Sequence, residues 1–166
     1  MHRNKITRGN ASQFFVAGEL CRRGYSAVVT LGNTPNTDIL CSNISGTKFV
    51  HIQVKTFVPS SKTCSVGIKA EKEYQRNFFW VLAGIPLPDS NANFCYYIIP
   101  SADMSMHIKK SFNAWLSEPG AKGNKHNYNT VRTVHIPPSR CKYDVEWDTE
   151  VYRDKWVLIE DCLKDD

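Results

Sequence analysis

The pattern of hydrophobic and polar positions predicts one amphipathic helix followed by a series of short strands. In residues 10–23 the apolar side chains recur at helical spacing, and Gly24 follows as a helix stop. The runs 25–31, 38–41 and 49–57 are rich in strand-forming residues and are separated by turns that contain Gly, Asn, Ser or Pro. The first third of the chain is therefore expected to form a helix and a three-stranded meander.

The rest of the chain continues as a mixture of strands and helices. The runs 78–84 and 94–100 are strongly apolar without polar alternation, which is typical of central strands. Further strands are expected at 64–68 and 131–136, and helices at 103–117 and 153–164. No linker divides these segments, so we expect a single α/β domain over residues 1–166.

Composition supports an ordinary globular domain. The chain has 166 residues, of which 42% are hydrophobic and 22% charged. No apolar run approaches the roughly 20 residues of a membrane span, and the basic start lacks the apolar core of a secretion signal. The six cysteines are scattered without a CxxC pair, so most are expected to be reduced core thiols. We expect a cytoplasmic protein that does not bind a membrane.

Charge is distributed unevenly along the chain. Residues 1–143 carry 18 Lys and Arg against 7 Asp and Glu, whereas residues 144–166 carry 3 against 9. A basic body favours a polyanionic partner through counterion release, although a solvated basic surface needs no partner. The acidic C-terminal segment is expected to lie away from any surface that contacts nucleic acid.

Polar residues on the strand at 49–57 suggest a site. If this strand pairs antiparallel with 38–41 about a turn at Ser45 and Gly46, Ile39 faces Ile52 and Asp38 faces Gln53. The apolar residues then share one face of the sheet. The other face carries Asp38, His51, Gln53 and Lys55.

This grouping has a simple and a chemical interpretation. Taken singly, Asp38 is typical of a turn, and Gln53 and Lys55 are typical of a solvated strand. Taken together, a carboxylate and an amide oxygen about 5 Å apart can share one hard cation, with an ammonium two residues along the strand. We leave His51 as a solvated or phosphate-facing residue.

The stretch "GNASQFFVAGELCRRGYSAVV…TDIL…FVHIQVKT" resembles the PD-(D/E)xK nuclease superfamily. It is most similar to the arm that includes archaeal Holliday-junction resolvases and methylation-dependent restriction endonucleases with a Gln-x-Lys motif. The resemblance covers about residues 9–56, a third of the chain. It implies a restriction-endonuclease-like fold, with a mixed central β-sheet flanked by helices, and Mg²⁺-dependent hydrolysis of DNA phosphodiesters, with Mn²⁺ as a possible substitute.

The resemblance also assigns roles to individual residues. It implies that Asp38, Gln53 and the backbone carbonyl of Val54 bind the metal ion. It implies that Lys55 orients the attacking water or stabilises charge on the phosphate. The family often has a Glu in its first helix, where this chain has Gln13, so Asp38 is the one carboxylate expected in the site.

Two further charged features, one acidic and one basic, have more ordinary interpretations. Glu19 is the nearest acidic alternative to Gln13, but it lies about 120° around the helix and is expected to be a surface or structural carboxylate. The loop "AKGNKHNYN" offers Lys122, Lys125 and His126 as phosphate contacts, although a solvated loop explains them equally well.

Three functions remain open at the level of sequence. The first is a metal-dependent DNA endonuclease, for which a homodimer is plausible because one site per chain must cut two strands. The second is a catalytically degenerate nucleic-acid-binding or protein-interaction module of the same fold. The third is an unrelated small α/β domain in which the Gln-x-Lys motif is coincidental.

Overall fold

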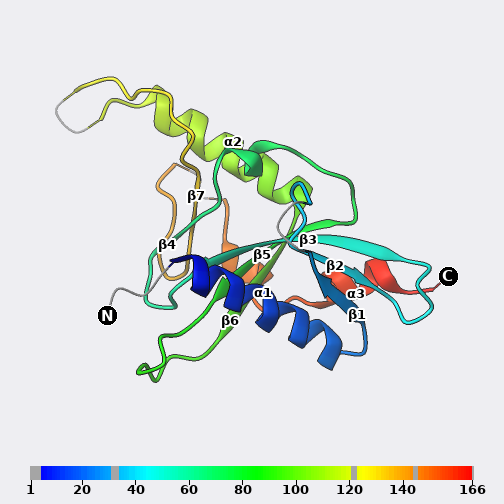
Figure 1. The fold of residues 1–166 in the computed structure, drawn as a ribbon. Coiled ribbons are helices and arrows are strands. Elements are labelled where there is room, and N and C mark those ends of the chain that lie inside the picture. The colour runs from blue at the N-terminus through cyan, green and yellow to red at the C-terminus, as the bar shows by residue number, and fades with distance from the viewer. Residues whose placement is uncertain (1–4, 31–33, 121–122, 144–145, 166) are drawn as a thin grey trace.

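A five-stranded mixed sheet forms the centre of the protein (Figure 1). The computed structural model describes residues 5–30, 34–120, 123–143 and 146–165. The helices and strands are α1 (Lys5–Arg22), β1 (Ser26–Val29), β2 (Ile39–Ser42), β3 (Phe49–Phe57), β4 (Thr63–Ser65), β5 (Phe78–Gly84), β6 (Cys95–Pro100), α2 (Ser101–Ser117), β7 (Thr133–His135) and α3 (Val157–Leu163). Two 3₁₀ turns, η1 (Ile68–Glu71) and η2 (Thr149–Tyr152), complete the regular structure of the described residues.

The strand order of the central sheet is β1-β2-β3-β5-β6. Strands β1, β2 and β3 form the antiparallel meander, and β3 then runs parallel to β5. The connection between these parallel strands contains β4 and η1, and β4 pairs with β7 in a separate two-stranded sheet. The fold is therefore the mixed α/β sheet flanked by helices that the sequence predicted.

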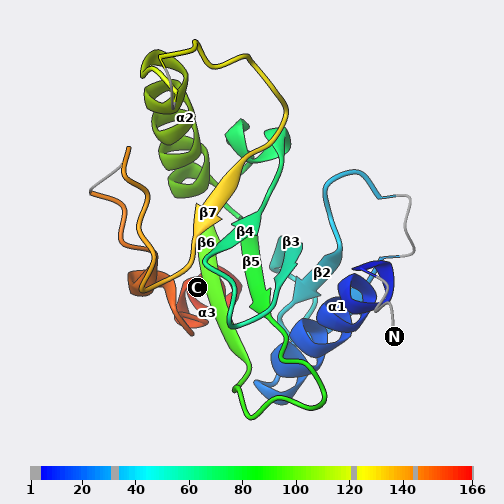
Figure 2. The same cartoon turned by 90° about the vertical axis from the view of Figure 1, so that its left-hand side faces the viewer.

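Each face of the central sheet has its own hydrophobic core. Helices α1 and α3 cover one face, where Val16, Leu20 and Trp156 pack against inward residues of the sheet. Helix α2 and the β4–β7 pair cover the other face, where Cys64 and Val134 pack around Trp80. Figure 2 shows the β4–β7 pair in front of the sheet, between α2 and α1. Strand β5 is buried along its whole length because both faces are covered.

Local sequence signals explain where α1 ends. Gly24 has a φ of 92°, a left-handed conformation that glycine adopts without a steric penalty. The N–H of Tyr25 then donates to the carbonyl of Leu20 at 3.1 Å, and the chain turns into β1. At the other end the helix starts at Lys5, five residues before the predicted start at residue 10.

The predicted hairpin register is confirmed. Ile39 pairs with Ile52 and Cys41 with Val50, as the shared apolar face required. The run at 64–68 differs from expectation, because only Thr63–Ser65 is a strand and the chain then enters η1. Gly67 has a φ of 75° and turns the chain at this point. In the part of the chain that the structure describes, no helix is both long and apolar enough to span a membrane.

Candidate active site

Backbone hydrogen bonds fix Asp38 at the start of β2. Its N–H donates to the carbonyl of Ile52 at 2.9 Å, and its carbonyl accepts from the N–H of Thr30 at 2.9 Å. Asn36, two residues before Asp38, has a φ of 62° and turns the chain into the strand. Asp38 is therefore held between β1 and β3, and its carboxylate has a defined direction.

The carboxylate of Asp38 faces the predicted partners on β3. Its Oδ2 accepts hydrogen bonds from the backbone N–H of Val54, at 2.7 Å, and from the side-chain amide of Gln53. The spatial pairing of Asp38 with Gln53 is thus present, as the hairpin register predicted. These two N–H donors on one oxygen partly stabilise the ionised carboxylate.

Burial and neighbouring groups act on Asp38 in opposite directions. Removal of water from the carboxylate raises its pKa, and this effect is the largest. It outweighs two opposing effects, the hydrogen bonds from Val54 and Gln53 and the positive charges of Lys55 and Lys69. A carboxylate that loses water on folding favours an added positive charge at the same place. The ionised form of Asp38 is therefore only partly compensated by its neighbours in the folded protein.

Lys55 lies on the same face of β3 as Gln53. Its ammonium nitrogen is 5.8 Å from the centre of the Trp80 ring, and Trp80 is the residue of β5 that pairs with Gln53. The positive charge of Lys55 interacts with Asp38 and opposes the rise of the carboxyl pKa that burial causes. Asp38, Gln53 and Lys55 are therefore brought together on one sheet face.

The donor set fits a hard divalent cation by its chemistry. It combines one carboxylate, one carboxamide and one backbone carbonyl, all of which are oxygen ligands of the kind that Mg²⁺ prefers. Among the described residues no group of three or more His, Cys, Asp or Glu is placed to hold a metal ion, so the amide and the carbonyl are needed beside the single carboxylate. The Gln53 amide turns its NH₂ toward Asp38, and it would have to present its oxygen to a cation instead.

Two residues near the site were not predicted from the sequence. Lys69 on η1 is exposed and adds positive charge near Asp38. Trp80 supports the Lys55 side chain and is 1% exposed. Their positions follow from the β3-to-β5 connection and from the parallel pairing, neither of which local sequence patterns determine.

Helix α1 approaches the sheet through Ser12. The Ser12 hydroxyl is fully buried and hydrogen-bonds the Thr56 hydroxyl at 2.6 Å. Thr56 belongs to the face of β3 opposite to Gln53 and Lys55, because side chains alternate along a strand. Gln13 follows Ser12 and is half-buried, and within the described residues no hydrogen bond links it to Asp38, Gln53 or Lys55. The role suggested for Gln13 stays a prediction.

Glu19 is a structural carboxylate, as expected. It forms ion pairs with Arg22 at 2.7 Å and with Arg23 at 2.8 Å on the outside of α1. These pairs, with the hydrogen bond from Arg22 first, lower the carboxyl pKa of Glu19. Its interactions place it in the outer surface of the helix and give no support for a metal ligand.

His51 lies beside the site, two residues before Gln53. Its Nδ1 is 3.2 Å from the hydroxyl of Thr37, the residue before Asp38. The same residues line an open pocket of about 500 Å³ that also includes Lys72, Tyr74 and Asn77. His51 therefore lies in the wall of a pocket next to the segment that carries Asp38.

The other predicted nucleic-acid contacts lie in a different part of the molecule. Figure 1 shows the loop after α2 at the end of that helix far from β3. Lys125 is exposed there, while the His126 ring stacks on Trp115 at 4.1 Å between centres. Lys122 lies outside the described residues. The loop and the Asp38 site are thus separate surfaces of one molecule.

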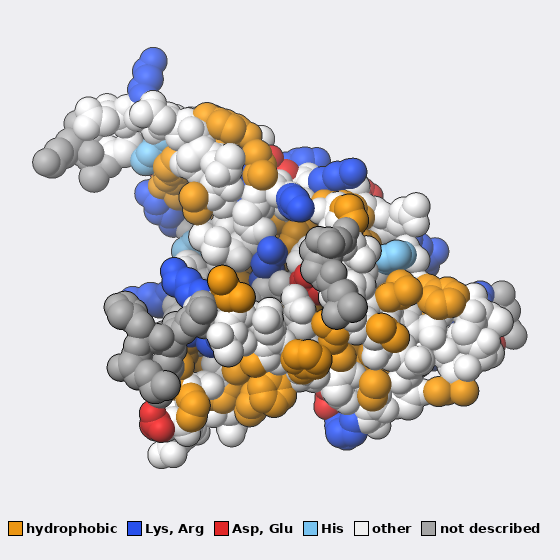
Figure 3. Space-filling view, viewed as in Figure 1, with side chains coloured by type: hydrophobic (Ala, Val, Ile, Leu, Met, Phe, Trp, Pro, Cys, Tyr) orange, Lys and Arg blue, Asp and Glu red, His pale blue; other side chains and the backbone are white. Residues whose placement is uncertain are grey.

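Charged side chains surround a hollow between these two regions. In Figure 3 the hollow lies between α2 above and α1 below, and Lys and Arg side chains are more frequent around it than Asp and Glu. The acidic C-terminal segment contributes α3, which packs on the sheet face opposite to Gln53 and Lys55. The side of the sheet that carries the candidate site is thus separated from α3.

Comparisons with known proteins identify the class of fold. The sequence matches no family model and no curated protein. Among solved structures, the chain is similar to a bacterial homing endonuclease, I-Ssp6803I, with a TM-score of 0.55 and 15% sequence identity. The similarity covers 96% of this chain and 95% of that chain. At this identity it shows that the chain has a nuclease-like fold.

Proposed function

We propose that this protein is a metal-dependent DNA endonuclease of the PD-(D/E)xK type, with Asp38, Gln53 and Lys55 as its active site. The observation that carries the proposal is the contact of the Asp38 carboxylate with Gln53 and Val54, on the sheet face that also carries Lys55. The similarity of nearly the whole chain to a homing endonuclease supports DNA as the substrate.

The chain's own residues divide the work of hydrolysis. Asp38, the Gln53 oxygen and the Val54 carbonyl would hold Mg²⁺ or Mn²⁺, which would supply positive charge to the phosphate and acidity to bound water. Lys55 orients the attacking water and stabilises the charge that develops on the phosphate oxygens. The water oxygen bonds to phosphorus and loses a proton to solvent, the phosphodiester P–O bond opposite to it breaks, and the leaving oxygen takes up a proton from solvent.

Substrate phosphates strengthen the metal site in this proposal. Asp38 is the one carboxylate among the proposed ligands, and the nearby ammonium groups of Lys55 and Lys69 oppose a cation. A DNA phosphate adds negative charge to the same position. We therefore propose that metal ion and DNA bind cooperatively. We also propose that a homodimer presents one site to each DNA strand.

A second function is supported by the state of Gln53. Its amide donates to Asp38 rather than offering an oxygen, so the structure also fits a domain that keeps the fold and binds nucleic acid without cutting it. Such a module would bind DNA with a steep dependence on salt and would release no cleaved product.

A cleavage assay separates the two functions. The substrates are plain duplex, methylated duplex, flap and four-way junction DNA, each with and without Mg²⁺ or Mn²⁺. The endonuclease proposal expects metal-dependent cleavage of at least one substrate that Asp38→Ala and Lys55→Ala abolish. Lys109→Ala, at an exposed position of α2, is the matched control and is expected to cleave normally. Robust metal-dependent cleavage by Asp38→Ala would contradict the assigned site.

A further inference from the structure

The β4–β7 pair is a two-stranded ribbon that stands apart from the central sheet. Its strands pair antiparallel, with Thr63 opposite His135 and Ser65 opposite Thr133. The middle pair, Cys64 and Val134, is almost completely buried and anchors the ribbon in the core below α2. The ribbon therefore has one face fixed in the protein and one face directed away from it.

The outward face of the ribbon carries hydroxyl groups. Thr63, Ser65 and Thr133 are exposed, and His135, opposite Thr63 on the same face, is half-buried. Within the described residues, no hydrogen bond engages the hydroxyls of the two threonines or of Ser65. Three short side chains that both donate and accept hydrogen bonds are thus presented in a compact row.

The ribbon lies next to the candidate active site. Strand β4 contacts β3, the strand that carries Gln53 and Lys55, and its Cys64 packs in the hydrophobic core on that face of the central sheet. Lys69, which influences Asp38, follows four residues after the end of β4. The ribbon is therefore a direct neighbour of the strand that carries the candidate site.

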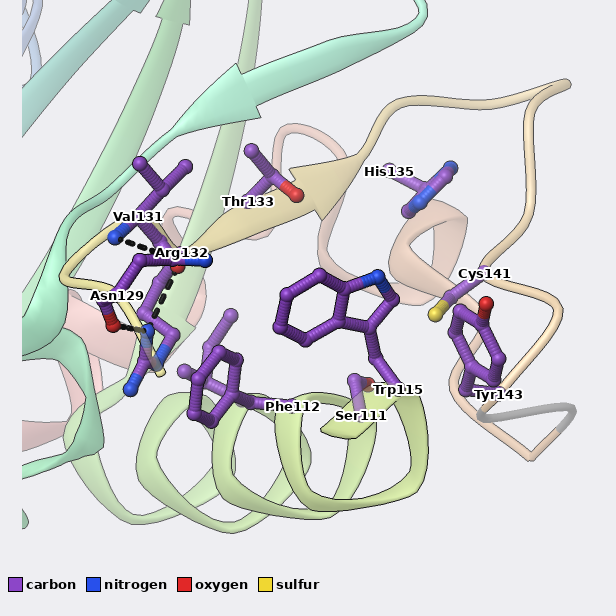
Figure 4. Close-up of a pocket in the computed structure, with 11 residues that line it drawn as sticks. Ser111, Phe112, Trp115, Asn129, Val131, Arg132, Thr133, His135, Cys141 and Tyr143 are labelled. Carbon is purple, nitrogen blue, oxygen red and sulfur yellow. Dashed lines mark hydrogen bonds between the residues drawn. The ribbon is translucent and has the colours of Figure 1, made fainter. Parts of the chain in front are cut away.

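The outward face continues into a pocket between β7 and α2. The pocket has a volume of about 220 Å³, and Thr133 and His135 form part of its wall. In Figure 4 these two residues lie on β7 above the pocket, while Phe112 and Trp115 rise from α2 below it. The hydroxyl groups are thus bordered by aromatic side chains of α2.

We propose that the outward face of the β4–β7 ribbon reads base edges in the groove of a DNA duplex held at Asp38 and Lys55. The inference rests on the proposed function, and it adds a specificity surface made by Thr63, Ser65 and Thr133. These hydroxyls donate to and accept from base edges, while the buried Cys64 and Val134 keep the ribbon rigid.

The shape and charge of the ribbon favour a duplex as its partner. A two-stranded ribbon, with strands about 4.8 Å apart, fits the roughly 12 Å width of the DNA major groove. Lys62 is exposed at the start of the ribbon, where it is placed to contact the phosphates that border the groove. Its carbonyl accepts the N–H of Ile136 at 2.9 Å, so the position of Lys62 is fixed by the ribbon's own pairing.

The test is selection from a pool of duplexes with randomised sequence, performed without divalent metal so that binding is measured apart from cleavage. The double variant Ser65→Ala/Thr133→Ala is expected to change the preference at one or two adjacent base positions by about fivefold or more. Lys62→Ala is expected to weaken binding to all sequences alike and to reduce the salt slope by about 1. Ser90→Ala, in the loop between β5 and β6, is the control and keeps the wild-type preference.

The outcomes distinguish this inference from the proposed function. Wild-type selectivity that the double variant retains would overturn the ribbon as the reading element, even if the protein cleaves DNA. A wild-type protein that binds without sequence preference, or that does not bind duplex at all, would overturn it as well. A shifted preference in a protein that never cleaves would support the ribbon and reject the endonuclease. Unchanged thermal unfolding of the variants, which alter only exposed hydroxyls, shows that the fold is intact.

Discussion

Asp38 and Val54 are joined by a 2.7 Å hydrogen bond from the backbone N–H of Val54 to the Asp38 carboxylate. This bond connects the start of β2 to the middle of β3, between Gln53 and Lys55 in sequence. The carboxylate, the amide and the ammonium are therefore positioned by the same two strands. A change in the hairpin register by one residue would place Gln53 and Lys55 on the opposite face from Asp38.

The substitution Gln53→Glu is expected to strengthen metal binding. An added unit charge about 4 Å from a cation contributes on the order of a few kcal/mol in a partly buried setting. Since each 1.4 kcal/mol is a factor of ten in affinity, we expect the Mg²⁺ or Mn²⁺ concentration for half-maximal cleavage to fall by about tenfold or more. The measurement is a metal titration of the initial cleavage rate.

The same variant has a readout that does not depend on activity. Without metal, two adjacent carboxylates repel each other, so Gln53→Glu is expected to unfold at a lower temperature than the wild type. Added Mg²⁺ should raise this temperature more in the variant than in the wild type. Gln75→Glu adds the same charge in an exposed loop and serves as the control. Equal metal responses of the two variants would argue against a cation at Gln53.

Asp38→Asn is expected to separate stability from activity. Burial raises the pKa of Asp38, so the proton binds more tightly in the folded state and the ionised form opposes folding. The stability gained from protonation is present at low pH and is lost as pH rises through the folded pKa. Without metal, the Asn variant should therefore be at least as stable as the wild type near neutral pH. As the pH falls into the acidic range, the free energy of unfolding of the wild type should rise relative to that of the variant. Urea unfolding at several pH values measures this difference.

Cleavage by Asp38→Asn should be absent at every pH, because an amide supplies no negative charge to a cation. A variant that is inactive because it is unfolded would show a lower unfolding free energy near neutral pH. Loss of cleavage with retained stability is therefore the result that assigns a functional role to the Asp38 charge.

Sequence patterns were sufficient to predict the hairpin and its site face. The apolar residues of 38–41 and 49–57 define one register, and that register alone brings Asp38 to Gln53. The pattern gave no equivalent constraint on Lys69 or Trp80. Their positions depend on how β5 pairs with β3 and how η1 returns over the sheet, which are long-range relationships.

The contact of α1 with the sheet shows a second limit of prediction from the sequence. Ser12 is spaced four residues before Val16 and eight before Leu20, so the helical period places all three on one buried face. A polar residue at such a position is easily assigned to the surface, because its buried partner cannot be identified from the helix alone. Thr56, the partner, is 44 residues away in sequence.

DNA affinity is expected to fall steeply with salt. In the proposed complex, basic side chains that neutralise DNA phosphates would release counterions, and each neutralised phosphate would add about 0.9 to the slope of log K against log salt. Lys125→Ala should reduce this slope by about 1 if the loop after α2 contacts a phosphate. Lys155→Ala, in the C-terminal segment, is the control and should leave the slope unchanged. Affinity that is equal at low and moderate salt would contradict a contact dominated by phosphates.

The ion pair between Arg132 and Glu71 is expected to hold η1 over the active site. The Arg132 side chain is 1% exposed, and its Nε donates to the Glu71 carboxylate at 2.5 Å. Its Nη1 donates to the backbone carbonyls of Asn129 and Val131, which ties the start of β7 to the same group (Figure 4). Removing Glu71 therefore leaves a buried guanidinium without its counter-charge.

Glu71→Ala should lower the free energy of unfolding by about 3–5 kcal/mol, the usual cost of breaking a buried pair from one side. Glu73→Ala, two residues later and exposed, should change it by no more than about 0.5 kcal/mol. Because η1 also carries Lys69, the loss of Glu71 should reduce cleavage even at temperatures where the protein remains folded. Denaturant unfolding and cleavage rates measured on both variants test this connection. Equal stability of the two variants would show that the Arg132 ion pair does not anchor η1.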